Sequence, residues 1–591
     1  MKTRTKKKPK PTSTRLNKTA LLLFALLAAS CGSSGDDAAE TVTISIIGTN
    51  DVHGTLLADG YVGGFDVFAG YLNNLREARS ADGGGVVLLD GGDMWQGTLE
   101  SNLSEGRSTV SIFNAVGYDA AAIGNHEFDF GPLGPNATPT SPGDDPQGAL
   151  KAHAALANFP LLSSNIIDTE TGTHIDWENV YPSVQKTVAG IEVGIIGGTT
   201  ESTPRTTIVA NIDGLEFSSL ALAFREQAEK LRATGADIVV ITVHAGGRCE
   251  EHDDPYDLAS CRENSEVFRA ARSLPEGLVD VIVGGHAHEG ISHFVNGIAI
   301  ISSYSNMRAF GRVDLTIDQA SRQVVDRKIF PPRPLCAVQA KTMDECANAP
   351  ETAMPARYEG KEVVADKRIQ AVVAEAIADV DAARNRRLGV IVADDFNRGR
   401  YPNTPIANLL SDIMLASSEI GDFALHNAVG GIRANLPAGD LTYGAVYQVF
   451  PFDNRVVHLE LTGAEVRAVY ERQMSVPRWT ASASGIRVTA ECRDGKPHVT
   501  LQRPDGSSIA DEEVLTVVTT DFLALGGDGI FSPVFPEEGF DYEDESPLFR
   551  DKMVQWLERR GGELRSADFA DAESLRFDLE QQPPFDCTSP D

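Results

Sequence analysis

Short β-branched runs alternate with amphipathic stretches through the N-terminal half of the chain, and this alternation constrains the fold more than any other feature. Helix-like segments such as Phe68–Arg79 and Leu220–Ala233 lie between several of the runs. Strands separated by helices are typical of a layered α/β domain, so we predict an α/β fold class. The strand-like runs are Val42–Ile47, Val86–Leu89, Ala120–Ile123, Val193–Ile196, Ile238–Val243, Val281–Val283 and Ile298–Ile301.

The C-terminal half predicts a second α/β domain. A segment with weak periodicity that contains Pro and Cys, residues 331–355, marks the boundary, and Val363–Arg387 is expected to form one long connecting helix. At 591 residues the chain is long enough to need two hydrophobic cores, which agrees with this division. The further expected elements are helices at Thr404–Ile420 and Pro547–Arg560 and strands at Val456–Leu461 and Val514–Val518.

The first thirty residues are typical of a targeting signal. The basic stretch Lys2–Lys18 precedes an apolar run, Ala20–Ala29, about half the ~20 residues that a membrane-spanning helix requires. The small residues before Cys31 resemble a bacterial lipoprotein signal, in which this cysteine is acylated. We therefore expect a membrane-anchored lipoprotein of the periplasm or cell surface; the alternative is ordinary cleavage nearby and a free soluble protein.

Charge and cysteine content narrow the possible partners and the compartment. The net charge of −32 disfavours binding to nucleic acid polymers, and no protein partner is predicted. If Cys31 carries lipid, six cysteines remain, an even number that indicates disulfides in an oxidising compartment. Zinc binding is the competing interpretation, but the sequence has no CxxC spacing. The expected pairs are Cys249–Cys261, Cys336–Cys346 and Cys492–Cys587.

Polar residues of one kind follow the strand-like runs. Aspartate, asparagine or histidine stands at the carboxyl end of five runs, and in open α/β sheets ligands bind at that edge. Imidazole nitrogen and carboxylate or amide oxygen suit a pair of divalent metal ions. One such residue alone is usually a cap or a surface residue, but five runs in succession indicate a metal centre. The candidate ligands are Asp51, His53, Asp93, Asn125, His244, His286 and His288.

The order DxH, GD, GNHE, a later His and GHxH resembles the signature of calcineurin-like metallophosphoesterases. The extended form GNHEFD resembles the bacterial 5'-nucleotidase/UDP-sugar hydrolase family in particular. This resemblance implies an N-terminal four-layer α/β metallophosphoesterase domain and a C-terminal α/β substrate-binding domain, joined by a helix. The expected boundaries are 1–31 for the signal peptide with the lipidated cysteine, 32–41 for a tether, 42–335 for the first domain, 336–387 for the linker and connecting helix, and 388–591 for the second domain.

The resemblance also implies how the candidate ligands divide between two divalent ions, for which Zn, Mn, Co, Mg and Ca are all candidates. Two ions about 3.5–4 Å apart can lower the pKa of a shared water, and the resulting hydroxide attacks phosphorus in line. His126, oriented by Asp129, would stabilise the transferring phosphoryl group or protonate the leaving oxygen. The implied ligand sets are Asp51, His53 and His288 for one ion and Asn125, His244 and His286 for the other, with Asp93 as the bridge.

Motifs in the C-terminal half resemble the substrate site of the same family. The segments Thr519–Gly529, Gly430–Arg433 and Phe450–Asp453 are similar to its DFLAxGGDG, GGIR and PF motifs. Two aromatic rings can hold a nucleobase between them, and arginines bind phosphate oxygens. Asn427 stands one residue before the position where the family has an asparagine. The implied roles are a base clamp for Phe452 and Phe522, ribose binding for Asp528, and contacts to the substrate for Arg400, Arg433 and Asn427.

Together these motifs predict an enzyme that hydrolyses nucleoside 5'-monophosphates to a nucleoside and phosphate, with nucleotide pyrophosphates or UDP-sugars as further substrates. A 2',3'-cyclic nucleotide phosphodiesterase/3'-nucleotidase is the nearest alternative, and a sulfur-oxidation thiosulfohydrolase a more distant one. The alternative from another class is a non-catalytic nucleotide-binding surface protein. That alternative predicts a missing ligand or a missing His126, and neither is missing.

Overall fold

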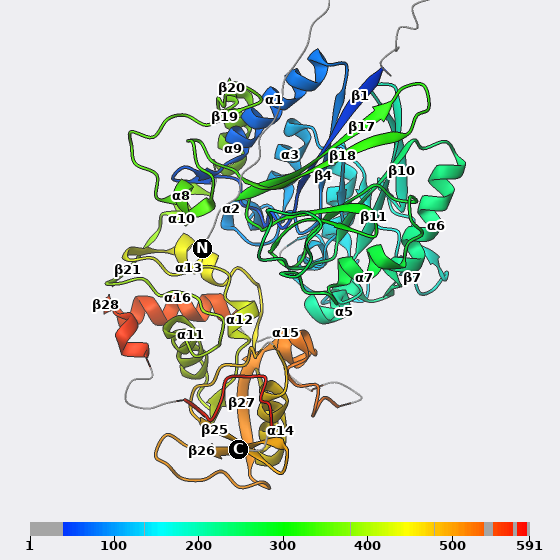
Figure 1. The fold of residues 1–591 in the computed structure, drawn as a ribbon. Helices are drawn as coiled ribbons and strands as arrows, with labels where there is room; N and C mark the ends of the chain where they lie inside the picture. Colours follow the sequence, from blue (N-terminus) through cyan, green and yellow to red (C-terminus); the bar gives the residue numbers. More distant parts are fainter. Residues whose placement is uncertain are drawn as a thin grey trace, which may run out of the picture. The chain divides into compact units, whose positions relative to one another are not determined.

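The computed structural model describes residues 40–591 except 135, 379, 478, 537–539, 541–547, 571–575 and 588–591. The expected signal peptide, Cys31 and most of the tether lie outside these residues. Residues 41–591 form one compact unit, in which the chain passes from an N-terminal half with two large sheets to a C-terminal half with three small ones (Figure 1). In the described part of the chain, no helix combines the length and apolar character needed to cross a membrane.

Two sheets form the centre of the N-terminal half. The first has seven strands in the order β18-β17-β1-β4-β5-β6-β9, and the second has six in the order β10-β11-β13-β14-β16-β15. The strands of the first sheet are β1 (Thr41–Thr49), β4 (Gly85–Asp90), β5 (Ala120–Ala122), β6 (Leu161–Leu162), β9 (Val180–Tyr181), β17 (Ala309–Asp318) and β18 (Val324–Pro334). Those of the second are β10 (Ser183–Val188), β11 (Ile191–Thr199), β13 (Ile238–His244), β14 (Val281–Gly284), β15 (Gly290–Val295) and β16 (Ile298–Ser303).

Helices cover the outer face of each sheet, so the domain has four layers. The helices α1 (Phe65–Ala81), α3 (Arg107–Val116) and α4 (Gly148–Leu156) share one core with the first sheet. The helices α6 (Leu220–Ala233) and α7 (Glu266–Ser273) share another with the second sheet. A third core lies between the sheets and is built from apolar residues of both, which confirms the α/β fold. Its members include Ile44, Val87, Val193, Val240 and Val281.

The sequence located the elements of this half well. Each of the seven expected strands is present, and α6 has the expected bounds of Leu220–Ala233. The connecting helix expected at Val363–Arg387 is wrong as a single element. Helix α9 begins only after Asp366, whose side chain accepts the backbone N–H groups of Arg368 and Ile369 and thereby caps it. The segment follows β20 (Lys361–Glu362) and instead contains α9 (Lys367–Ile377), α10 (Asp381–Arg384) and the start of β21 (Arg387–Val392).

The C-terminal half contains three small sheets, in the orders β23-β21-β28, β22-β27-β24 and β26-β25-β29. The expected strands are confirmed as β24 (Val456–Thr462) and β27 (Val514–Thr520), and the last expected helix is α16 (Phe549–Arg560). Helix α11 (Pro405–Ala416) begins as expected after its cap Thr404, but it ends four residues before the expected Ile420. The other main elements are β22 (Phe423–Ala424), β23 (Gly439–Thr442), α13 (Tyr443–Val449), α14 (Gly463–Met474), β25 (Arg487–Arg493), β26 (Lys496–Gln502), β28 (Gly562–Leu564) and β29 (Phe577–Leu579).

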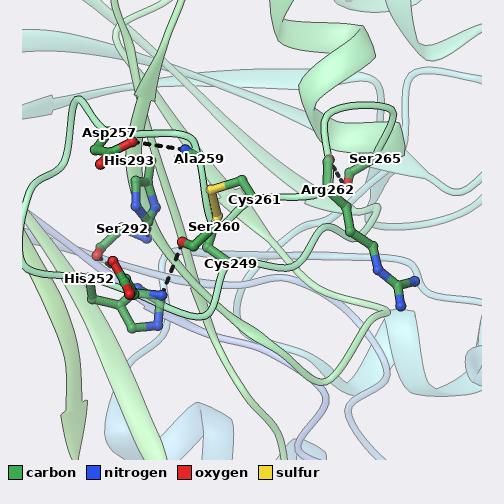
Figure 2. The surroundings of a disulfide bond; sticks show 11 residues. Cys249, His252, Asp257, Ala259, Ser260, Cys261, Arg262, Ser265, Ser292 and His293 are labelled. Atoms are coloured by element: carbon green, nitrogen blue, oxygen red, sulfur yellow. Dashed lines mark hydrogen bonds between the residues drawn. A yellow bond between two sulfur atoms is a disulfide. The ribbon is translucent and has the colours of Figure 1, made fainter.

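All three expected disulfides are present. Cys249–Cys261 closes a loop after β13, Cys336–Cys346 closes one after β18, and Cys492–Cys587 ties the end of the chain to β25. The first of them lies among His252, Ser292 and His293 (Figure 2). Three disulfides in one chain are typical of a protein that matures in an oxidising compartment.

Candidate active site

The candidate metal ligands lie at the carboxyl ends of strands from both sheets. β1, β4 and β5 are parallel neighbours in the first sheet, and β13 and β14 are parallel neighbours in the second. The strand ends alone indicated one ligand-bearing edge. The structure forms the site where the edges of two stacked sheets meet, in agreement with the four-layer domain that the resemblance implies. The packing of one sheet on the other therefore assembles the site.

The backbone at these turns is unusual. The φ angles of Asp51, His53, Asp93, His286 and His288 are 50°, 49°, 60°, 74° and 57°. Non-glycine residues rarely adopt this left-handed region, and such strain clusters at functional sites. Backbone hydrogen bonds hold the conformation, since the N–H of Asp51 donates to Gly92 O and the N–H of His53 donates to Asp93 O, both at 2.9 Å.

The first group of donors consists of Asp51, His53, Asp93 and His288. One donor atom from each lies within 4.8 Å of all the others. Nε2 of His53 is 2.9 Å from Nε2 of His288, and the latter nitrogen is 3.2 Å from Oδ1 of Asp51. Two imidazole nitrogens and two carboxylates that converge in this way form a donor set suited to a divalent cation.

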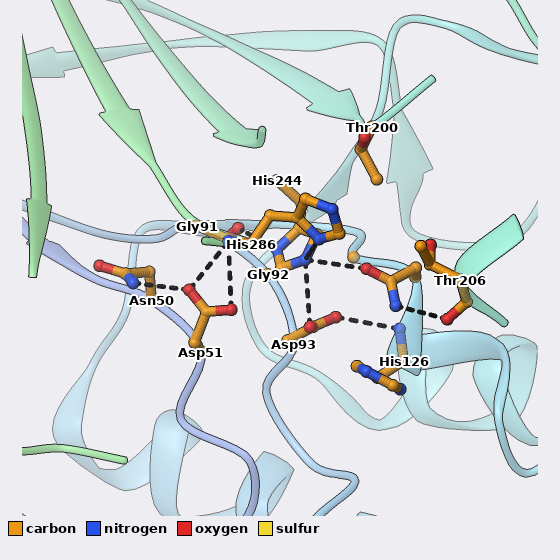
Figure 3. A network of polar contacts seen from close by, with 12 residues as sticks. Asn50, Asp51, Gly91, Gly92, Asp93, His126, Thr200, Thr206, His244 and His286 are labelled. Carbon is orange, nitrogen blue, oxygen red and sulfur yellow. Dashed lines mark hydrogen bonds and ion pairs between the residues drawn. The ribbon is translucent and has the colours of Figure 1, made fainter. Parts of the chain in front are cut away.

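The second group consists of Asn125, His244 and His286 together with Asp93. Figure 3 shows His244 and His286 beside Asp93. Nε2 of His244 lies 3.0 Å from Oδ2 of Asp93, 3.1 Å from Oδ1 of Asn125 and 3.2 Å from Nδ1 of His286. Oδ2 of Asp93 is also 3.8 Å from Nε2 of His53, so the same carboxylate oxygen borders both groups. Asp93 therefore occupies the position expected of a bridging ligand.

Backbone carbonyls fix the orientation of two of these imidazoles. Nδ1 of His53 lies 2.8 Å from Gln96 O, and Nδ1 of His244 lies 2.9 Å from Gly91 O. A carbonyl oxygen can only accept, so each Nδ1 carries a proton and each Nε2 faces the centre. This is the arrangement that metal-binding histidines adopt.

The electrostatics of the donors also fit a cation. Burial alone would lower the pKa of His244, but Asp93, Asp51 and Glu127 raise it to about 10. Burial, reinforced by the neighbouring His244, lowers the pKa of His286 to about 3, so that this imidazole is neutral. The buried carboxylates thus create a strongly negative potential beside neutral nitrogen donors. The residues present therefore fit the divalent ions that the sequence predicts.

His126 lies beside the donors without belonging to either group. Its backbone N–H donates to Oδ1 of Asp93 at 2.9 Å, while Nδ1 lies 2.6 Å from Oδ2 of Asp129. Asp129 is held in turn by the hydroxyl of Thr207, which donates to Oδ1 at 2.8 Å. Burial would lower the pKa of His126, but Asp129 and Asp93 outweigh it and raise the pKa above its usual value. An imidazolium in this position can donate a proton.

Two buried residues that support the site were not identified from the sequence. The Glu127 carboxylate accepts the backbone N–H groups of Asp93, Met94 and Gly124 at 2.8, 2.7 and 2.6 Å, and this fixes the turn that carries Asp93. Nδ2 of Asn50 donates to Oδ2 of Asp51 at 2.6 Å. The signal for both was adjacency, since Asn50 directly precedes the candidate ligand Asp51 and Glu127 directly follows His126.

A cleft of about 1610 Å³ opens beside the donors. It is lined by thirteen of the fifteen residues that the sequence predicts for the site, from both halves of the chain. The other two, Asp51 and His244, are fully buried behind it. The lining residues among the fifteen are His53, Asp93, Asn125, His126, Asp129, His286, His288, Arg400, Asn427, Arg433, Phe452, Phe522 and Asp528.

The C-terminal side of the cleft reaches the donors directly. Nη2 of Arg433 donates to Nε2 of His53 at 2.9 Å, and its guanidinium lies 5.7 Å from the centre of the Phe452 ring. The Phe452 ring is itself 5.9 Å from the ring of His126. A cation and an aromatic ring from the second half therefore border the metal-type donors of the first.

Asn427 and Asp528 form a second polar pair on this side. Nδ2 of Asn427 donates to Oδ2 of Asp528 at 2.8 Å. Asn427 makes this contact although it stands one residue before the position expected from the motif. Asp528 has a φ of 53°, so its turn presents the carboxylate in a left-handed conformation. Arg400 is exposed and lies 5.9 Å from the ring of Tyr401.

Comparison with known proteins agrees with this arrangement. Residues 44–290 match the model of the calcineurin-like phosphoesterases, and residues 384–537 match that of the 5'-nucleotidase C-terminal domain. The chain is 28% identical to the 5'-nucleotidase of Vibrio cholerae over 532 residues, which are 83% of this chain and 86% of that protein. It is also 28% identical to endonuclease YhcR of Bacillus subtilis over 516 residues, 84% of this chain but only 38% of that longer protein.

A solved structure shows the same fold. The 5'-nucleotidase precursor from Thermus thermophilus superimposes with a TM-score of 0.70 at 23% identity, and the match covers 92% of this chain and all of that one. The fold and the site thus define a two-domain metallophosphoesterase, a hydrolase of phosphoric monoesters. More narrowly, the chain belongs to the 5'-nucleotidase family, whose C-terminal domain it carries.

Proposed function

We propose that this protein is a 5'-nucleotidase that depends on two divalent metal ions. The observation that carries the proposal is the composition of one cleft, in which metal-type donors face arginines and phenylalanines of the other half of the chain. The ions would be held by Asp51, His53 and His288 and by Asn125, His244 and His286, with Asp93 between them. When bound, they supply a nucleophilic water and neutralise the charge of the phosphoryl group.

The chain's own residues perform the remaining tasks. Arg433 and Arg400 bind phosphate oxygens, because guanidinium groups contact them in a bidentate manner. Phe452 and Phe522 hold the base between their rings, and the Asn427–Asp528 pair binds the ribose hydroxyls. His126 stabilises the transferring phosphoryl group or protonates the leaving oxygen, and Asp129 keeps its ring in place.

Organisation and location follow from the same proposal. We assign residues 42–335 to catalysis and 388–591 to substrate binding, with 336–387 between them. The three disulfides support a periplasmic or cell-surface location, where oxidation is possible. A lipid on Cys31 would anchor the protein to a membrane.

A substrate panel tests the proposal. AMP, UMP, UDP-glucose, ATP, 3'-AMP and 2',3'-cyclic AMP are each incubated with the purified protein and with several divalent metals in turn. We expect phosphate release from the 5'-monophosphates that a chelator abolishes and added metal restores. Preference for 3'-AMP or the cyclic nucleotide would favour the cyclic phosphodiesterase alternative, and no turnover with any metal would favour a non-catalytic binding protein.

A further inference from the structure

One part of the cleft wall is not used by the proposed nucleotide site. At about 1610 Å³ the cleft is larger than most small-molecule pockets, which measure roughly 300–1,000 Å³. Part of the extra space borders the phosphoesterase half, next to the turn that carries His286 and His288. The lining residues of this wall, which we call the arginine wall, include Arg248, Arg262, Asn264, Ser265, Asn306 and Arg308.

Two arginine-bearing segments of this wall are anchored at the catalytic centre. Gly246, two residues before Arg248, packs so closely on Ala287 that an added Cβ would lie 2.6 Å from the Cβ of that residue. Ala287 stands between the two histidines of the GHxH turn. On the other segment, the N–H of Asn306 donates to Asp51 O at 2.8 Å, two residues before Arg308. Both segments therefore begin next to candidate metal ligands.

The disulfide Cys249–Cys261 fixes the position of Arg262. It joins two loop segments that also form an isolated antiparallel bridge, and the N–H of Arg262 donates to Arg248 O at 2.9 Å. The Arg262 side chain extends away from the sulfur atoms (Figure 2). The loop thus presents this guanidinium from a cross-linked base, which reduces the entropy lost when a ligand binds.

The charge of the wall is positive although the chain as a whole carries −32. Two glutamates line the cleft beside this wall, Glu266 and Glu289, and each already has a polar partner. Oε1 of Glu289 lies 3.6 Å from Nε of Arg248, and Oε2 of Glu266 accepts the hydroxyl of Thr200 at 2.7 Å. Among the described residues no ion pair involves Arg262 or Arg308, and both are exposed in the cleft. Two guanidinium groups thus remain available for an anion.

The position of Arg262 and Arg308 relative to the substrate follows from the proposed function, on which this inference rests. The nucleoside lies on the C-terminal side, and the transferred phosphoryl group lies at the metal-type donors. A substituent on the far side of that phosphoryl group would extend toward the arginine wall. Nucleoside monophosphates have no such substituent, whereas esters of nucleoside diphosphates carry one on the distal phosphorus.

We propose that Arg262 and Arg308 form a subsite for an anionic group attached to the transferred phosphoryl group. The substrate class is a nucleoside diphosphate esterified with an acidic group, such as a sugar acid. In its hydrolysis one water adds to the distal phosphorus and the bond from that phosphorus to the bridging oxygen breaks. The nucleoside monophosphate leaves with the bridging oxygen, and the acidic group keeps its phosphate.

A matched pair of substrates tests the subsite. UDP-glucuronate and UDP-glucose differ in one place, where a carboxylate replaces a hydroxymethyl group, and UMP lacks the sugar altogether. We expect the wild-type protein to show a higher kcat/KM for UDP-glucuronate than for UDP-glucose. Arg262→Ala and Arg308→Ala should each lower the value for UDP-glucuronate by roughly tenfold, the lower range for hydrogen bonds to a charged group. The value for UDP-glucose should fall less than threefold and that for UMP should not change.

Two further variants serve as controls. Arg262→Lys keeps the charge and should retain part of the preference, and Arg225→Ala, on the outer helix α6, should leave all three substrates unaffected. Equal losses on the two UDP-sugars, no loss in either alanine variant, or a wild-type preference for UDP-glucose would each overturn the subsite. A wild-type protein that fails to hydrolyse UMP with any metal would instead contradict the proposed function, so the two failures are distinguishable.

Discussion

The side-chain amide of Gln96 donates a hydrogen bond to the backbone carbonyl of Pro451 at 3.3 Å. The backbone carbonyl of Gln96 accepts from Nδ1 of His53 at 2.8 Å, so this one residue contacts both a candidate metal ligand and the loop that carries Phe452. Gln96 is only 2% exposed. Nδ2 of Asn102 donates to the same Pro451 oxygen at 3.2 Å. The position of the loop that carries Phe452 is therefore tied to the candidate metal site.

Gln96→Ala should separate these two contacts. The variant keeps the backbone carbonyl that orients His53 but loses the bond to Pro451, a bond worth about 0.5–1.5 kcal/mol. We expect KM for AMP to rise roughly 2- to 10-fold, while kcat for p-nitrophenyl phosphate and the metal content stay near wild type. Asn102→Ala should have a similar effect. A matching loss on p-nitrophenyl phosphate would show that the Gln96 side chain supports the metal centre itself.

Asp93→Asn should weaken the binding of both ions. The carboxylate of Asp93 borders both donor groups, and an amide in its place cannot offset the repulsion between two cations. We expect metal content, measured by mass spectrometry of the purified protein, to fall together with activity, and activity to fall by orders of magnitude. Circular dichroism should show an unchanged fold. Near-normal turnover with two ions bound would contradict the bridging role.

His126→Ala should affect the chemical step and not the metals. Its imidazole is oriented by Asp129 and lies outside both donor groups, so its removal should lower kcat by a general-acid factor of ~10²–10⁴. Metal occupancy should remain close to that of the wild type. Loss of an ion from this variant would make His126 a ligand instead.

Replacement of Phe452 or Phe522 by alanine should distinguish a base clamp from a packing role. Stacking on a base is worth about 1–3 kcal/mol, which corresponds to a roughly 5- to 150-fold loss of kcat/KM for nucleotides. Hydrolysis of p-nitrophenyl phosphate, which has no base, should be nearly unaffected. Equal losses on both substrates with a lowered Tm would indicate a core role, since removal of a core phenylalanine costs ~3–5 kcal/mol.

His426 should make the C-terminal half sensitive to acid. It is fully buried next to Phe450 and Phe549, and burial lowers its pKa to about 3. The folded pKa lies below the unfolded value of ~6.5, so the unfolded state binds more protons below that pH and stability falls as pH decreases toward 3. The loss between pH 7 and pH 5 should be about 2 kcal/mol from this group.

A comparison with His426→Leu measures this contribution. The variant lacks the titrating group, so its Tm should decrease less than that of the wild type between pH 7 and pH 5. The other titrating groups are common to both proteins, and their effects cancel in the difference. Parallel decreases in both proteins would show that protonation of His426 does not control acid stability.

The sequence predicted what depends on local pattern and missed what depends on packing. The bounds of Leu220–Ala233 were predicted because its apolar spacing and its flanks agree. The candidate ligands were found because each stands at the end of a buried strand or within a few residues after it. The stacking of two sheets was implied only by the resemblance to a four-layer domain, because nothing in a run such as Val281–Val283 specifies the sheet to which it belongs.

The errors have equally specific causes. The long helix expected at Val363–Arg387 joined separate amphipathic pieces, because its periodicity outweighed the cap at Asp366 and the strand at Arg387. The role of Glu127 depends on three backbone N–H groups that only the folded turns bring together. A buried carboxylate that accepts from the backbone has no sequence signature of its own.

Because the candidate ligand residues adopt a left-handed conformation, substitutions there that increase stability should decrease activity. Asparagine and glycine tolerate this conformation better than aspartate or histidine, and replacing a buried carboxylate also relieves repulsion in the metal-free protein. A library selected only for resistance to heat, in the presence of a chelator, should therefore enrich asparagine or glycine at Asp51 and Asp93. Those clones would outlast the parent protein and be inactive, so a thermostable nucleotidase has to be sought by screening turnover in every round.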